Sequence, residues 1–125
     1  MSIQYKVVSK KPGLSSQVRY YPVLTGRKVI GLHQVCEYIS KSSSFHAADV
    51  VGVVEALVVA VPYFISMGGN VHLDGLGTFS VHASSKGKDS AEEVTSKDIS
   101  ELKMSFLPDK RIKRALKDFK FKKAK

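Results

Sequence analysis

The sequence predicts an α+β protein with a β-extension, two helices, a three-stranded antiparallel sheet and a short basic helix, in that order. Three changes of pattern along the 125 residues predict it. Apolar residues alternate near the start, recur at helical spacing after Gly31, and alternate again after Gly68 and Gly69. A chain of this length holds one domain's worth of core, with room for a small extension. Its hydrophobic fraction of 43% and charged fraction of 25% are those of a globular protein rather than a disordered one.

The N-terminal segment, Met1 to Gly26, is predicted to be a β-extension. In "SIQYKVVSKK" the residues Ile3, Tyr5 and Val7 fall on one face of a strand. The turn signal "KPGL" separates this strand from a second one, "VRYYPVLT". Pro22 cannot donate a hydrogen bond to a neighbouring strand, so we expect the second strand at a sheet edge.

A short helix is predicted after Gly31, because four apolar residues recur there at helical spacing: Leu32, Val35, Cys36 and Ile39. Cys36 is then interpreted as a core thiol, since no catalytic base is paired with it in the sequence. A single cysteine allows no internal disulfide and fits a reducing compartment.

A second helix is predicted from about His46 to Ser66. The serine run "SKSSS" ends the first helix, and Ser44 is the expected N-cap of the second. The second helix is apolar nearly all the way round, so it must be buried on every side. A chain this small cannot surround such a helix, and we therefore expect a subunit interface. Its expected residues are Val50, Val53, Val54, Leu57, Val58, Val61, Phe64 and Phe79.

The sequence predicts neither a membrane helix nor a secretory signal. The least polar run, Ala56 to Met67, has 12 residues and contains Pro62. A membrane span needs roughly 20 apolar residues. The first twenty residues hold no continuous apolar stretch, so a cytoplasmic location is expected.

Two strands, "NVHLDG" and "GTFSVHA", are predicted after the glycine pair, which supplies the exit from the second helix. Gly75 and Gly77 allow a tight connection and a close approach of the backbone to another surface. "ELKMSFL" is the predicted third strand, and Pro108 the predicted first residue of the last helix. The apolar stripe of that helix is Ile112, Ala115, Leu116 and Phe119.

The net charge of +9 lies almost entirely at the two ends of the chain. Residues 1–28 hold six basic side chains and no acid, and residues 103–125 hold ten against two acids. Between them, residues 29–79 carry −3 and residues 80–102 carry −2. Clustered positive charge is typical of a protein that binds a polyanion. The alternative interpretation is a solvated tail that only aids solubility.

The order of elements, with "ADVVGVVEAL", "GLGTF" and "FLPDKRIKRAL", resembles the HU/IHF family of bacterial DNA-bending proteins. The resemblance is to its longer branch, seen in Bacteroides-like bacteria, which carries an N-terminal strand extension. It implies an intertwined homodimer whose two β-arms reach round double-stranded DNA through the minor groove. The implied domains are a β-extension over 1–28, an HU/IHF-like domain over 29–119 and a basic tail over 120–125.

A set of ten basic residues is expected to contact DNA phosphates without reading base sequence, in a histone-like, nucleoid-associated role. These residues are Arg27, Lys28, Lys86, Lys88, Lys103, Lys110, Arg111, Lys113, Arg114 and Lys117.

The expected arm, Ser85 to Glu101, departs from the family pattern. Family arms are basic and carry a proline near the tip, which wedges between base pairs. This chain has no proline between Pro62 and Pro108, and its arm holds three lysines against five acids. Phosphates repel an acidic tip, so the sequence does not predict intercalative kinking.

The sequence predicts no enzyme, cofactor, metal site or small-molecule substrate. The four histidines, His33, His46, His72 and His82, show no metal-ligand spacing, and "GLGT" lacks the lysine of a phosphate loop. Two other functions stay open. The chain could be a structural or protein-interaction homodimer that has lost DNA binding, as the acidic arm suggests, or it could bind RNA.

Overall fold

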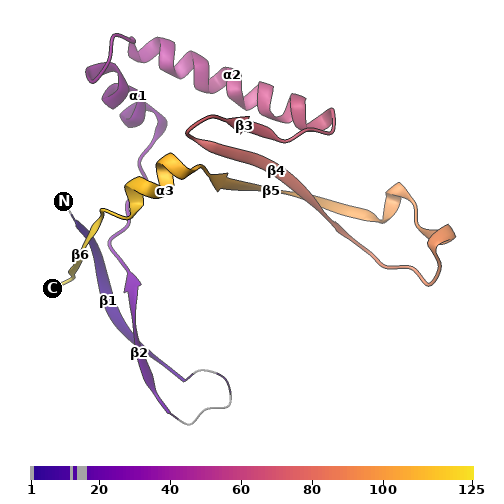
Figure 1. Ribbon diagram of the computed structural model, residues 1–125, viewed down its shortest axis with the longest axis horizontal. Coiled ribbons are helices and arrows are strands. Elements are labelled where there is room, and N and C mark those ends of the chain that lie inside the picture. Colours follow the sequence, from indigo (N-terminus) through magenta and orange to yellow (C-terminus); the bar gives the residue numbers. More distant parts are fainter. Residues whose placement is uncertain (1, 12, 14–16) are drawn as a thin grey trace. The chain divides into compact units, whose positions relative to one another are not determined.

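The computed structural model describes residues 2–11, 13 and 17–125 (Figure 1). The chain divides into two compact units. The first combines Met1–Gly31 with Arg114–Lys125, and the second is Leu32–Lys113. Helix α3 (Lys110–Leu116) begins in the second unit and ends in the first.

The first unit is a three-stranded sheet in the order β2-β1-β6. Strand β1 (Ser2–Lys10) pairs antiparallel with β2 (Arg19–Leu24), and Pro22 lies on this edge strand as predicted. The predicted turn at 11–14 lies largely outside the described residues. Strand β6 (Lys120–Lys123) pairs parallel with the start of β1 and was not predicted. The sequence analysis placed 120–125 in a basic tail because "KFKK" has too few apolar residues to show alternation.

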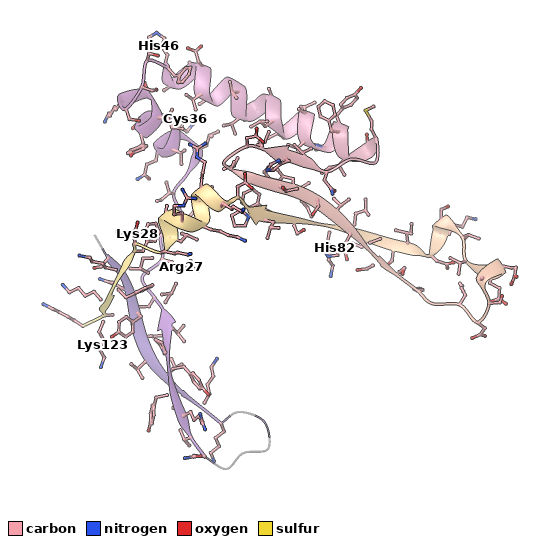
Figure 2. All side chains as sticks on the ribbon, in the orientation of Figure 1. Arg27, Lys28, Cys36, His46, His82 and Lys123 are labelled. Carbon is pink, nitrogen blue, oxygen red and sulfur yellow. The ribbon has the colours of Figure 1, made fainter. Side chains whose placement is uncertain are left out.

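The second unit begins with α1 (Leu32–Lys41) and α2 (Ala47–Ser66). Cys36 is 1% exposed, which confirms it as a core thiol; Figure 2 shows it on α1, with His46 before α2. The predicted N-cap Ser44 is wrong. His46 occupies that position and makes no side-chain cap hydrogen bond. The serine run instead closes α1, where the hydroxyls of Ser42 and Ser43 donate to carbonyls at the helix end.

Helix α2 ends in the glycine exit that the sequence predicts. Gly68 has φ +90°, a conformation that favours glycine because it has no Cβ. The N–H of Gly68 donates to the carbonyl of Ile65, and the N–H of Gly69 donates to that of Phe64. These two bonds form a Schellman motif and turn the chain back toward the sheet.

The sheet of the second unit is three-stranded and antiparallel, as predicted, and its strand order is β3-β4-β5. Its strands are β3 (Val71–Leu73), β4 (Gly77–Ser85) and β5 (Ile99–Pro108). A Cβ on Gly77 would overlap the Leu107 carbonyl oxygen and would lie 2.6 Å from the Phe106 ring, so only glycine allows this approach.

The start of the last helix was predicted two residues too early. Pro108 is the last residue of β5, paired with Gly77, and α3 begins at Lys110. The helix also ends at Leu116, so Phe119 lies outside it and does not extend its apolar stripe. Strand pairing therefore continues into a residue that local preference assigns to a helix.

Helix α2 is covered along one stripe only. Among the described residues, Cys36 and Val61 are the only buried apolar side chains. On the other faces of α2, Val53, Val58 and Val59 are 61–72% exposed. The helix is long and apolar enough to cross a membrane, with a mean hydropathy of 2.0, although the sequence analysis judged its least polar run too short. The core helix of a soluble protein passes the same test of length and composition.

Candidate nucleic-acid interface

One face of the β4–β5 ribbon is mostly polar, and we call it the polar face. Strand alternation and register place Thr78, Ser80, His82 and Ser84 of β4 opposite Leu107, Ser105, Lys103 and Glu101 of β5. His82 is directly opposite Lys103, and the hydroxyls of Ser80 and Ser105 lie 3.1 Å apart. Figure 2 shows His82 on this ribbon, which runs past α2 to a distant tip. Of the residues on this face, only Lys103 was among the expected phosphate contacts.

The opposite face of the ribbon is apolar and continues onto α2. Phe79 and Met104 line a hollow of about 340 Å³ together with residues of α2: Val54, Leu57, Val58, Val61 and Pro62. Five residues expected in the dimer interface therefore surround one hollow. Leu102, Met104 and Phe106 lie on the same apolar face, are 63%, 52% and 43% exposed, and were not among the expected interface residues. Their alternation with polar residues in "ELKMSFL" is the sequence signal that places them on one face of the strand.

The start of α3 is fixed to the turn between β3 and β4 by Asp109. Its carboxylate accepts a hydrogen bond from the N–H of Gly75 at 2.9 Å and lies 3.2 Å from Nε2 of His72. The Asp109 N–H donates to the carbonyl of Leu76. A Cβ on Gly75 would lie 2.6 Å from Nη1 of Arg111, so the guanidinium lies against the turn. Asp109 thereby holds the start of α3, with Lys110 and Arg111, beside the sheet, a role that no local sequence signal reveals.

The tip of the arm is a folded turn that uses its own charges. It holds two short 3₁₀ helices, Ala91–Glu93 and Ser96–Asp98. Asp98 is 9% exposed and forms a capping box with Thr95. Its carboxylate also forms an ion pair with Lys88, with 3.4 Å between Oδ1 and Nζ. Lys88, one of the expected phosphate contacts, is therefore already paired with a carboxylate.

The expected phosphate contacts are divided between the two units. Lys103 and the first basic residues of α3 belong to the second unit. Lys86 and Lys88 belong to it too, but they follow the last residue of β4, at the arm tip. Arg27 and Lys28 belong to the first unit, where they line a hollow of about 480 Å³ beside the start of β1. Arg114 and Lys117 also belong to the first unit.

No metal cluster is visible in the part of the chain that the structure describes, where no three His, Cys, Asp or Glu side chains could hold an ion. The absence of a metal, a cofactor or a catalytic activity remains a prediction.

A protein family described as an HU domain fused to wHTH, Ig, or glycine-rich motif (HU-HIG) matches residues 1–123. The chain belongs to the HU-HIG family. The resemblance to HU-like proteins predicted from the sequence is thus confirmed, and the match includes the N-terminal extension. No curated protein matches the chain significantly.

A solved structure shares the fold of this HU-HIG chain. It is a protein from Bacteroides vulgatus ATCC 8482 described as a "putative bacterial DNA binding protein", with a TM-score of 0.69 and 14% sequence identity. The similarity covers 98% of this chain and 49% of the other, so the chain spans about half the length of that protein.

In the HU-HIG chain, the Asp109 contacts predict a pH dependence of stability. The N–H of Gly75, and then His72, hold the pKa of the Asp109 carboxyl below its ordinary value of 3.8. Stability from a lowered pKa is present above the unfolded value and is lost as pH falls through the folded one. Asp109→Asn should therefore melt at a lower temperature than wild type at pH 6, and this difference should shrink below about pH 3.8.

Melting curves from pH 6 to pH 3 at one protein concentration measure this difference. Asp118→Asn is the matched control, since no carboxylate contact of Asp118 is seen among the described residues, and it should melt like wild type throughout. An Asp109→Asn deficit that stays constant with pH would contradict the prediction.

Proposed function

We propose that the chain forms an HU-like homodimer that binds double-stranded DNA through the phosphate backbone, with little sequence preference. Its role would be architectural, in the nucleoid of the cytoplasm. The observation that carries the proposal is the match of an HU-domain family to residues 1–123. The description of the Bacteroides vulgatus protein as DNA binding supports it.

The proposed contacts combine α3 with the polar face of the ribbon. Lys110, Arg111 and Lys113 begin α3, and Asp109 fixes that end to the sheet. Lys103 projects from the polar face beside His82. Lysine and arginine neutralise phosphates irrespective of base sequence, which accounts for the low specificity proposed.

The uncovered apolar surface supports the proposed dimer. The exposed faces of α2 and the apolar ribbon face meet at one hollow, and burying one such Val, Leu, Met or Phe side chain contributes about 1.5–3 kcal/mol. A second copy presents the same surface, as a two-fold interface requires.

The arm argues for coating DNA rather than kinking it. Its tip has no proline to hold a base step open, and Glu92 and Glu93 are exposed there. The same acidic tip favours the rival function, a structural or protein-interaction dimer without DNA binding. RNA is the third candidate ligand, because phosphate contacts alone do not distinguish it from DNA.

The proposed dimer predicts a mass of twice 13.7 kDa by light scattering at low micromolar concentration, without detergent. Val54→Asp or Leu57→Asp should unfold the chain, because each buries a charge in the apolar hollow. Val94→Asp makes the same change at the exposed tip and should leave fold and mass unchanged. A folded wild-type monomer, or one that needs detergent or vesicles to stay in solution, contradicts the dimer.

Phosphate contacts predict steep salt dependence, with a log–log slope of about −0.9 per phosphate neutralised. Changing Lys110, Arg111, Lys113 and Arg114 together to Gln should flatten the slope and weaken binding to all duplex sequences about equally. The control changes Lys11, Lys41, Lys97 and Lys125 to Gln, which removes the same charge elsewhere. No duplex affinity of wild type at low salt would favour the interaction dimer, and tighter binding of RNA would favour the third candidate.

For the acidic tip, we predict that removing negative charge does not weaken DNA binding, the opposite of the effect of removing positive charge from α3. Glu92→Gln with Glu93→Gln should leave DNA affinity unchanged or strengthen it slightly, most visibly at low salt, where screening is weakest. An end-to-end distance assay on a short duplex should show little kinking by wild type. Weaker binding by the double variant, or a sharp bend, would show that the arm grips DNA.

A further inference from the structure

The net positive charge of this protein lies in its first unit. The second unit, Leu32–Lys113, holds eight basic residues against ten acidic ones, a net charge of −2. The first unit holds twelve Lys and Arg residues against one acid, Asp118, a net charge of +11. Attraction for a polyanion therefore concentrates on the small sheet β2-β1-β6.

The register of this sheet sorts its side chains onto two different faces. Alternate residues of a strand point to opposite faces, and paired residues share a face. One face is apolar and lines a hollow of about 580 Å³ with Tyr5, Val7, Tyr20, Pro22, Leu24 and Phe121. The other, which we call the basic face, carries Lys6, Lys10, Arg19, Lys120 and Lys122, with Ser2, Gln4, Val8, Tyr21 and Val23 among them.

The cations of the basic face are exposed and lie along the length of the sheet, with Lys10 and Arg19 at one end and Lys120 and Lys122 at the other. All five are exposed, and among the described residues none forms an ion pair with an acid. Lys10 is directly opposite Arg19 on the neighbouring strand, a like-charge pair that destabilises a sheet on its own. Lys120 and Lys122 are two residues apart on β6, which spaces their Cα atoms about 7 Å apart. A row of bound phosphates neutralises these lysine and arginine charges and so removes their mutual repulsion, whereas water only screens it.

We propose that the basic face is a second DNA-binding surface, which takes the phosphate backbone of a duplex. It is separate from α3 and the polar face of the ribbon, and it was absent from the contacts that the sequence predicted. The inference rests on the proposed function for its ligand. Charge complementarity selects a polyanion, and the HU domain of the same chain makes that polyanion double-stranded DNA.

The test compares two triple variants of the full chain that have equal net charge. The face variant carries Lys6→Gln, Lys10→Gln and Lys122→Gln, all on the basic face. The matched control carries Lys11→Gln, Lys123→Gln and Lys125→Gln. It removes three charges from the same unit, but Lys11 and Lys125 lie outside the strands and Lys123 shares the opposite face with Tyr5. Circular dichroism and melting temperature establish that both variants fold.

Duplex affinity is measured from 50 to 300 mM salt for wild type and both variants. We expect the face variant to bind about 100-fold more weakly at the lowest salt, at about 1 kcal/mol per lost contact in water. Its log–log slope should be shallower by about 2.7, since three phosphates are no longer neutralised. The control should stay within about threefold of wild type. Equal losses in both variants would mean that only total charge matters, and would overturn the inference.

The design separates the failure of this inference from that of the proposed function. If wild type binds no duplex at 50 mM salt, the proposed function fails, and this inference with it. If wild type binds and the face variant binds equally well, only the inference is wrong. Tighter binding of a single-stranded RNA of the same length through the same face would overturn the choice of DNA.

A footprint on the wild-type protein gives a second readout that needs no variant to fold. Lysines are acetylated with and without saturating duplex and are quantified by mass spectrometry. We expect protection of Lys6, Lys10, Lys120 and Lys122, and none of Lys123. Protection of α3 lysines alone would leave the proposed function standing and overturn the inference.

Discussion

The constraint on which the rest of the structure depends is that the second unit buries very few apolar side chains of its own. Helix α2 is covered along one stripe only, and of the described apolar side chains only Cys36 and Val61 are buried. Its remaining faces and the apolar side of the ribbon, with Leu102 and Met104, are open. Since hydrophobic burial is the main favourable contribution to folding, covering that surface, as in the proposed dimer, would stabilise the fold.

If the proposed dimer covers the apolar faces, the polar and charged faces are the surfaces that remain for a ligand. Strand alternation leaves a polar ribbon face with His82 and Lys103, and a basic face on the first sheet. Asp109 then ties the start of α3 to the β3–β4 turn. The backbone that carries the first cations of α3 therefore has a fixed position relative to the turn. Each unit thus separates an apolar face from a polar or charged one.

The arm shows how charge can be used for structure instead of contact. Asp98 closes the tip by capping its last 3₁₀ turn and pairing with Lys88, which removes a lysine from the set free to meet phosphate. The acids that remain exposed repel a polyanion. A compact acidic tip and a strongly basic first unit together move the expected contact with nucleic acid away from the arm.

The sequence by itself determined the features that local chemistry decides. The period of apolar residues predicted α1, α2 and β1, Gly68 and Gly69 predicted the end of α2, and Pro22 predicted an edge strand. Tertiary structure alone decided the pairing of β6 with β1, because "KFKK" becomes a strand only beside residues more than a hundred positions earlier. It also decided the anchor between Asp109 and Gly75, 34 positions apart, and the sorting of lysines onto one face. Those features depend on which distant segments meet, and local periodicity carries no record of that.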